Sequence, residues 1–355
     1  METKYYKLNP KALDHHILDE AVKCLKKGEL VAFPTETVYG LGADGLNGKA
    51  CEKIFQTKGR PSDNPLILHI FEKNQLEDLV LDLPQDINKI IENFWPGPLT
   101  IILKRKGIIP DIVTAGGDTV GIRYPKSPIA QGLLAKLGHP IAAPSANLSG
   151  KPSPTTGEDC LEDLEGKIPM ILDGGPTSIG IESTVLDLTV SPYRILRPGF
   201  YTKEDFSALG IETVYDKSII KDGHIPKSPG QKYKHYAPKA QVTVFVGDET
   251  KRLQGMQDEI HLRKNQKIGL LLFEEHLHQF QGLKRSLGRQ NHLEEMAQLL
   301  FFRLREMDRL GVDEILIEGI NQPGLGISIM NRLKKSAGGR MKVYEEERDG
   351  KCNSF

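Results

Sequence analysis

Residues 33–45 read FPTETVYGLGADG, and this stretch takes the chain from an apolar strand into a polar, glycine-rich segment. The predicted strand runs into Pro34, hydroxyl and acidic side chains follow, and Gly40 and Gly42 come next. Glycines let a backbone approach a ligand closely, but they also build tight turns between a strand and a helix. The segment alone supports both interpretations equally.

Outward from this stretch, residues 15–210 alternate apolar runs with amphipathic segments. Apolar runs typical of strands lie at 30–33, 66–70, 99–103, 120–123, 170–172 and 184–188. Amphipathic segments typical of helices lie at 17–27, 49–57, 85–94, 128–137 and 158–164. This order predicts a mixed α/β domain.

A second domain is expected because 355 residues exceed the roughly 250 to 300 at which single cores stop growing. Residues 221–239, KDGHIPKSPGQKYKHYAPK, have five lysines, three prolines and no periodic apolar face, which is typical of a linker. Most such linkers are solvated tethers. Tyr233, His235 and Tyr236 also lie among the lysines, and aromatic rings there can stack on a base while lysines contact phosphates.

The chain after the linker repeats the strand and helix alternation. VTVFVG from 242, KIGLLLF from 267, a long helix at 292–310 and EILIEGI from 314 predict a smaller parallel α/β domain. Its closing segment, GLGISIMNRLKKSAGG (324–339), has two glycines before an amphipathic helix, as phosphate-binding loops do. It lacks both the dinucleotide fingerprint and the Walker pattern, so close backbone packing is the favoured interpretation.

Composition excludes several classes of protein. Forty-seven basic residues balance forty-seven acidic ones, so no global field marks a nucleic-acid or membrane-surface binder. We expect a cytoplasmic protein that is neither secreted nor inserted in a membrane, because the N-terminus lacks an apolar leader and no run approaches roughly 18 apolar residues. Four widely spaced cysteines, which predict reduced thiols, are Cys24, Cys51, Cys160 and Cys352.

Cations and hydroxyls gather at the ends of the predicted strands and helices. Lys58 and Arg60 end a predicted helix, where they could grip a polyphosphate or merely complement the helix dipole. Arg123 ends an apolar strand, which suits two-point binding of a carboxylate. His69 alternates with apolar residues, as core histidines do. A loop after the predicted strand at 140–143 offers further polar side chains, Ser145, Asn147, Ser149 and Ser153, and the segment GIESTVLDL offers Ser183 and Thr184.

This inventory offers no activated nucleophile. We find no G-x-S-x-G elbow, no HExxH motif and no cysteine in a plausible Cys and His setting. Chemistry that depends on charge neutralisation and positioning, such as attack on a phosphorus of ATP, fits these residues best.

Nine separated segments make the chain resemble the YrdC/Sua5 family, in its long form with a C-terminal Sua5 domain. They are, in order, FPTETVYGLGAD, KGRPSDNPLILHI, WPGPLTIIL, GIRYP, APSANLSG, ESTVLDL, LRPG, SPGQKYKHYAP and GLGISIMNRLKKSA. The resemblance implies a twisted mixed-sheet YrdC-like catalytic domain at 1–212 with a concave basic cavity, a linker at 213–240, and a smaller Rossmann-like α/β domain at 241–355. It also implies a nucleotidyltransferase that makes threonylcarbamoyl-AMP from L-threonine, bicarbonate and ATP.

The resemblance assigns roles residue by residue. Lys58 and Arg60 are implied as catalytic ligands of the ATP phosphates. The residues implied to bind threonine are Thr35, His69, Arg123 and Ser183. The further residues implied to bind ATP are Asn64, Thr119, Ser145, Asn147, Ser153, Arg197 and Tyr236.

Partners follow from the same resemblance. Mg²⁺ is expected with the triphosphate rather than in a dedicated protein site. The product would pass to a separate transferase that makes N6-threonylcarbamoyladenosine in tRNAs reading ANN codons. Two other functions are compatible with the sequence: an RNA-binding module, which the neutral charge disfavours, and a threonine sensor acting through the second domain, which has no comparable polar motifs.

Overall fold

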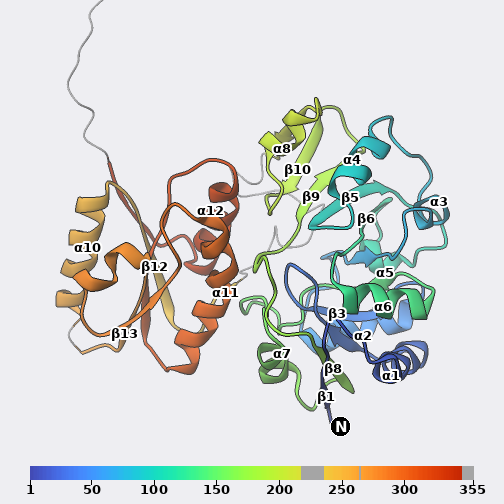
Figure 1. The fold of residues 1–355 in the computed structure, drawn as a ribbon, viewed down its shortest axis with the longest axis horizontal. Coiled ribbons are helices and arrows are strands. Elements are labelled where there is room, and N and C mark those ends of the chain that lie inside the picture. The colour runs from blue at the N-terminus through green and yellow to red at the C-terminus, as the bar shows by residue number, and fades with distance from the viewer. Residues whose placement is uncertain (217–235, 264, 346–355) are drawn as a thin grey trace, which may run out of the picture.

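The computed structural model describes residues 1–216, 236–263 and 265–345, which form two α/β domains (Figure 1). Among these residues the first sheet has 11 strands in the order β1-β8-β2-β3-β7-β4-β6-β5-β9-β10-β11, with both parallel and antiparallel neighbours. Its strands are β1 (Lys4–Lys7), β2 (Val31–Phe33), β3 (Gly40–Asp44), β4 (Ile67–His69), β5 (Leu99–Lys104), β6 (Thr119–Arg123), β7 (Ile141–Ala142), β8 (Met170–Asp173), β9 (Thr184–Asp187), β10 (Tyr193–Arg197) and β11 (Thr213–Tyr215).

The helices of the first domain surround this sheet. They are α1 (His15–Lys26), α2 (Gly48–Lys58), α3 (Gln75–Leu79), α4 (Ile87–Phe94), α5 (Asp111–Thr114), α6 (Pro128–Leu137), α7 (Gly157–Leu164) and α8 (Lys203–Ala208). Helix α6 has the bounds that the sequence predicts. The Ser127 side chain caps its first turn, Pro128 occupies the start, and Gly138 ends it in the left-handed conformation, so local chemistry fixes both ends.

The second domain is a smaller sheet covered by helices on both faces. Its strands are all parallel, in the order β14-β13-β15-β12-β16, as the buried apolar runs predict. They are β12 (Gln241–Gly247), β13 (Ile268–Leu272), β14 (Leu283–Ser286), β15 (Glu314–Glu318) and β16 (Met341–Tyr344). The helices are α10 (Glu249–Leu262), the short 3-10 helix η1 (Glu274–Gln279), α11 (Leu293–Arg309) and α12 (Leu325–Ser336).

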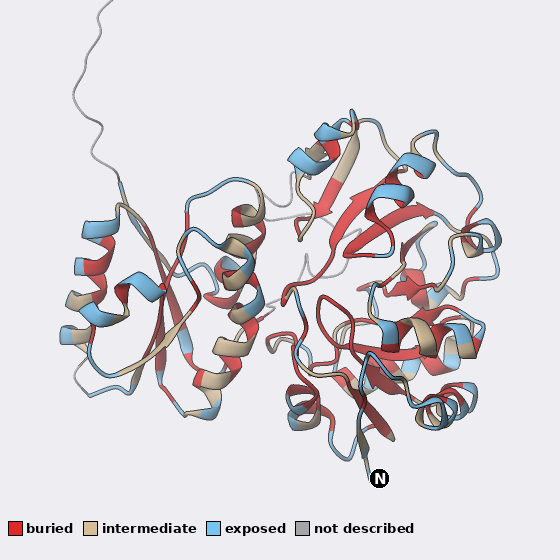
Figure 2. Cartoon of the chain, viewed as in Figure 1, coloured by how far each residue is buried: buried red, intermediate tan, exposed pale blue. Residues whose placement is uncertain are grey.

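Helices α11 and α12 lie on the side of the second sheet that faces the first domain (Figure 1). Buried residues continue across this junction (Figure 2), where Val38 and Ile181 of the first domain share one apolar cluster with Phe301 of α11. The backbones also approach closely: at Gly180, whose φ is 82°, a Cβ would lie 2.4 Å from the Gln298 Cα. The two domains therefore pack together at this face.

Most of the predicted linker lies outside the described residues, including Tyr233 and His235. Strand β11 pairs in parallel with β10, so the first sheet extends to Tyr215, into the segment predicted as linker. The second sheet begins at Gln241.

Candidate active site

Most of the residues predicted to bind ligands face one cavity in the first domain. It lies where β4 and β6 end, beside the segment between β2 and β3 and the loop after β7. Parallel neighbours bring β4 and β6 to a common edge, with His69 opposite Arg123. The predicted site residues that line the cavity are Thr35, Lys58, Arg60, His69, Arg123, Ser145, Asn147, Ser183, Arg197 and Tyr236.

Lys58 points across the cavity wall rather than back along its own helix. Its ammonium donates to the backbone carbonyls of Ser145 and Asn147, which belong to the loop after β7. Burial, followed by the charge of Arg60, holds the pKa of Lys58 well below its ordinary value. Lys58 is therefore tied to the loop after β7 rather than to the carbonyls at the end of its own helix, and its role toward phosphates stays a prediction.

Arg60 and Arg197 add to the same positive field. Burial is the first cause that lowers the pKa of Arg60, to about 10, and the charge of Arg197 also lowers it. Arg60 donates to the Asn64 carbonyl at 3.3 and 3.2 Å and to the Pro65 carbonyl. Buried cations that repel one another are stabilised strongly when an anion binds between them, because little water is present to screen their charges.

Arg123 has a carboxylate partner within the protein. Its Nη2 lies 2.7 Å from a Glu36 oxygen, its Nη1 donates to the Thr37 hydroxyl at 2.9 Å, and its Nε donates to the Gly97 carbonyl. Both members of the Arg123–Glu36 ion pair are buried. A ligand carboxylate at Arg123 must therefore share the guanidinium with Glu36 or displace it.

His69 and Ser183 complete a polar wall beside Arg123. Burial, followed by the charge of Arg123, lowers the pKa of His69 to about 3, so the imidazole is neutral at physiological pH. The Ser183 hydroxyl shares a hydrogen bond of 2.8 Å with the Thr100 hydroxyl and accepts one of 3.0 Å from Arg197 Nη2. This wall offers neutral and cationic groups to a small polar ligand.

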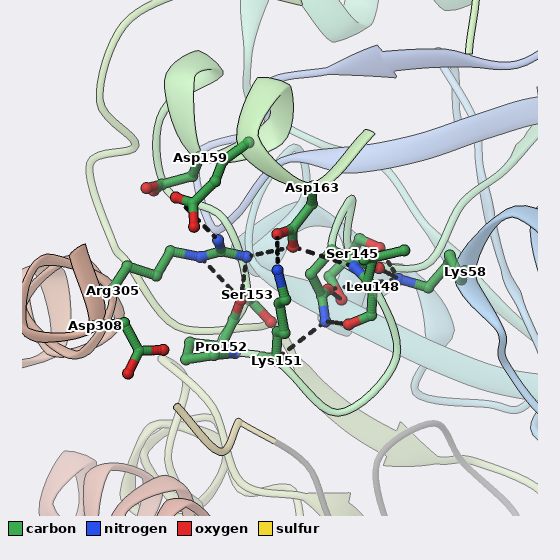
Figure 3. Close-up of polar contacts among 12 residues, drawn as sticks. Lys58, Ser145, Leu148, Lys151, Pro152, Ser153, Asp159, Asp163, Arg305 and Asp308 are labelled. Carbon is green, nitrogen blue, oxygen red and sulfur yellow. Dashed lines mark hydrogen bonds and ion pairs between the residues drawn. The ribbon is translucent and has the colours of Figure 1, made fainter. Parts of the chain in front are cut away.

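The loop after β7 is held by a network that reaches the second domain (Figure 3). Asp163 of α7 accepts from the Leu148 amide at 3.1 Å and from the Lys151 ammonium at 2.7 Å. Arg305 of α11 donates to Asp163 at 2.8 Å and to the Pro152 carbonyl at 2.7 Å. A buried ion pair between the two domains, Arg305–Asp163, therefore holds the loop after β7 that accepts hydrogen bonds from Lys58.

The comparisons with known proteins agree over nearly the whole chain. A threonylcarbamoyl-AMP synthase from Bacillus subtilis (strain 168) is 46% identical over 327 residues, which cover 91% of this chain and 93% of that protein. One from Pyrococcus abyssi is 44% identical over 324 residues, 89% of this chain and 93% of the relative. The chain belongs to the Sua5/YrdC family.

Both domains match profiles of this family. The Sua5/YciO/YrdC profile, described as telomere recombination, matches residues 23–199, and the profile of the threonylcarbamoyl-AMP synthase C-terminal domain matches residues 201–338. The crystal structure of P. abyssi Sua5 complexed with L-threonine superposes with a TM-score of 0.91 at 41% identity, over 96% of this chain and 100% of the other. The predicted fold, a mixed-sheet domain followed by a parallel α/β domain, is confirmed.

Three of the residues assigned from family resemblance lie outside the cavity lining. Asn64 is buried beside it and holds Arg60 through its carbonyl. Ser153 lies behind the wall and donates to Glu182, which does line the cavity. Thr119, at the start of β6, lines a separate cavity of about 310 Å³ with Asp118. Their roles toward ATP stay predictions.

Tyr236 is the one predicted linker residue with a site role that the structure describes. It is buried in the cavity wall, and its ring lies 5.1 Å from that of Phe301 in α11. Its φ of 63° is in the left-handed region, which a bulky residue adopts only where its surroundings hold it. The wall of this Sua5/YrdC site therefore includes a ring fixed by the second domain.

Sequence reasoning missed the two carboxylates of the site. Glu36 pairs with Arg123, and Glu182 pairs with Arg332 of α12. Glu36 lies within FPTETVYG and Glu182 within GIESTV, so the signal available was a single acidic residue inside each polar motif. Their partners lie 87 and 150 positions away along the chain, which no local pattern reveals.

The described part of the chain lacks a clustered set of metal ligands and a membrane-spanning helix. There, no group of three or more His, Cys, Asp or Glu side chains could hold a metal ion. Within the same residues, no helix combines the length and apolar character needed to span a bilayer. Cys24, Cys51 and Cys160 are free thiols, and Cys352 lies outside the described residues.

Proposed function

We propose that this protein synthesises threonylcarbamoyl-AMP and pyrophosphate from L-threonine, bicarbonate and ATP. The observation that carries the proposal is one cavity in which Lys58, Arg60 and Arg197 lie beside Arg123 and His69. A cationic surface for phosphates next to a guanidinium for a carboxylate fits two anionic substrates that must meet. The relatives named threonylcarbamoyl-AMP synthase support the same reaction.

In this proposal the threonine carboxylate binds Arg123, in competition with Glu36. The neutral threonine amine takes up the carbon of bicarbonate, water leaves, and a carbamate forms. A carbamate oxygen then bonds to the α-phosphorus of ATP while the bond from that phosphorus to the bridging oxygen breaks. Pyrophosphate leaves with that electron pair, and Lys58 and Arg60 stabilise the charge that develops on the phosphates.

Magnesium enters this scheme as part of the substrate MgATP. The cavity wall is mainly cationic, and its carboxylate Glu182 is engaged by Ser153 and Arg332. Phosphate oxygens and water, rather than protein carboxylates, would therefore hold the ion. The protein then acts as a cytoplasmic nucleotidyltransferase. It supplies a separate transferase that modifies tRNAs reading ANN codons.

The decisive experiment follows labelled bicarbonate into the nucleotide product. The wild-type protein should release pyrophosphate only when threonine, bicarbonate and ATP are all present, and the product mass should rise by the one labelled carbon. A passive RNA-binding module or a threonine sensor would release none. Pyrophosphate release without threonine, or a product without the label, contradicts the proposal.

We expect the enzyme to prefer threonine over serine by a modest factor and over valine by a larger one. Serine differs from threonine by one methyl group, worth roughly 1 to 3 kcal/mol, so it should be a poor but detectable substrate. Valine lacks the hydroxyl, which would leave a buried polar partner such as Ser183 or His69 without its hydrogen bond. The measurement is kcat/KM for each amino acid. Valine outperforming serine would show that the hydroxyl is not recognised.

ATP binding should take up protons. The lowered pKa of Lys58 rises when a polyphosphate binds beside it, so binding is coupled to proton uptake between the pKa values of the free and bound states. ATP affinity should accordingly fall as pH increases toward the ordinary lysine value. Calorimetric titration at about pH 8.5, in two buffers with different ionisation enthalpies, measures the uptake. Proton uptake should vanish in Lys58→Met. It should persist in the control Lys53→Met, because the Lys53 ammonium pairs with Glu29. Equal uptake in all three proteins contradicts the assignment.

A further inference from the structure

The motif at 324–339 places its polar side chains against the first domain. Arg332 of α12 is completely buried, and its Nε donates to Glu182 at 3.1 Å. Its Nη1 donates to the Pro198 carbonyl, and the Ser328 hydroxyl donates to the Gly199 carbonyl at 2.7 Å. The motif is therefore engaged with the segment around β10 rather than with a phosphate ligand of its own.

Glu182 connects Arg332 to the substrate cavity. It lines the cavity, and only 7% of its side chain is exposed. One carboxylate oxygen receives Arg332, and the other accepts from the Ser153 hydroxyl. Arg332, Glu182 and Ser153 thus form a continuous chain of charge-assisted hydrogen bonds that begins in the second domain and ends at the substrate loop.

The charge of Glu182 opposes the task proposed for this cavity. Burial alone would raise its pKa, but the charges of Arg332 and Arg197 and the Ser153 hydrogen bond hold the pKa below its ordinary value. Glu182 is therefore an anion at neutral pH, in a wall proposed to receive a triphosphate. A buried carboxylate there is compatible with ATP only if a cation compensates it.

We propose that Arg332, a residue of the C-terminal domain, is a positioning residue for ATP in the N-terminal domain, acting by compensating Glu182 and holding it on Ser153. The inference rests on the proposed function and deepens it. The guanidinium also lies 6.0 Å from the centre of the Tyr236 ring, the aromatic group of the cavity wall. The second domain thus completes the electrostatics of the substrate site.

A second contact supports this role for the α11 and α12 face. Arg305 of α11 holds the same loop one residue away from Ser153, through the Pro152 carbonyl, and further along through Asp163 (Figure 3). Both arginines are buried, and each meets a carboxylate of the first domain. Two independent ion pairs across one junction converge on residues 148–153.

The test compares four full-length variants with the wild type. Arg332→Met removes the charge at similar length, and Glu182→Gln keeps an acceptor for Ser153. The double variant Glu182→Gln/Arg332→Met removes both charges. Arg303→Met is the matched control, because Arg303 is an α11 arginine whose polar and ring partners among the described residues, Ser286, Glu306 and Phe302, all belong to its own domain. For each protein, pyrophosphate release gives kcat and the KM values for ATP and threonine, and calorimetry gives the ATP Kd.

Arg332→Met should raise the KM and Kd for ATP by about tenfold or more, because one uncompensated charge faces the phosphates. The KM for threonine should change less than about threefold, and Arg303→Met should match the wild type. The double variant should recover most of the ATP affinity, since it buries no unpaired charge.

The pH profile separates this mechanism from a general loss of structure. Without Arg332 the pKa of Glu182 rises, so the ATP defect of Arg332→Met should shrink as pH falls and Glu182 takes up a proton. In the double variant that pH dependence should disappear. The charged and titratable groups that act directly on Glu182 are Arg332, Arg197 and Tyr236. The same cavity is also lined by Lys58, Arg60, His69, Arg123 and Lys151, and the comparison between variants cancels the titration of all these groups.

The outcomes are decisive in each case. If the wild type is active and Arg332→Met keeps the wild-type KM and Kd for ATP, or shows the same defect at every pH, this inference is wrong. If Arg332→Met does not fold, the double variant decides: an ATP KM within about threefold of wild type supports the inference, and a tenfold rise overturns it. Failure of the wild type to release threonine-dependent pyrophosphate instead overturns the proposed function.

Discussion

Replacing Lys58 or Arg60 by alanine should lower kcat/KM for ATP by about 10- to 100-fold. Each change removes a cation whose pKa is lowered first by burial and then by a neighbouring like charge, Arg60 for Lys58 and Arg197 for Arg60. Loss of one charge-assisted contact to a phosphate costs roughly 1.5 to 3 kcal/mol, which corresponds to this range of rates. The measurement is pyrophosphate release as a function of ATP concentration at saturating threonine.

Lys53→Ala is the matched control for Lys58→Ala. Lys53 lies on the same helix, α2, but its ammonium pairs with Glu29 at 2.7 Å near the surface, away from the cavity. We expect kcat/KM within about twofold of wild type, because exposed ion pairs contribute little. Wild-type ATP kinetics in both Lys58→Ala and Arg60→Ala would remove these residues from the phosphate site.

The sequence was sufficient for the parts of the fold that local chemistry determines. Helix α6 has capping residues at both ends, and the buried strands of the second domain are continuous apolar runs. Strand β3 was not predicted because its sequence, GLGAD, is typical of a turn. Gly42 is there for packing: a Cβ would lie 2.8 Å from both the Phe33 ring and Ile141. Strand β1 was also missed, since it pairs with β8 far along the chain.

The sequence motifs predicted many of the residues that line the site, but not which residues contact one another there. Ten of the residues assigned from the family motifs line one cavity, and two of them, His69 and Arg123, do so because the parallel strands β4 and β6 end at one edge. Their partners depend on tertiary contacts. Arg123 was predicted to bind a ligand carboxylate, but in the structure it pairs with Glu36. No sequence pattern predicted that α11 and α12 pack against the loop after β7 and the Glu182 segment.

Asp163→Ala should destabilise the protein by about 3 to 5 kcal/mol. The side chain is fully buried and receives Arg305, Lys151 and the Leu148 amide. Its removal leaves the Arg305 guanidinium, 3% exposed, without its closest carboxylate. Thermal and denaturant unfolding of the full chain measure the loss. Glu162→Ala is the control, because its carboxylate is 40% exposed and its contacts to Arg305 and Arg309 are 4.0 and 3.4 Å long, so less than about 1 kcal/mol is expected.

Two further measurements distinguish loss of the Asp163–Arg305 ion pair from simple loss of packing. One changes both residues, and the other varies the pH. Asp163→Ala/Arg305→Met should be more stable than Asp163→Ala alone, because no charge is then buried without a partner. Although burial opposes it, hydrogen bonding to Arg305 and the Lys151 contact hold the pKa of Asp163 below its ordinary value of 3.8. The ion pair therefore stabilises the fold above that value and loses its contribution as pH falls through the lowered pKa. The stability difference between wild type and Asp163→Asn should narrow in acid. If Asp163→Ala is no less stable than Glu162→Ala, the cross-domain ion pair does not hold the loop.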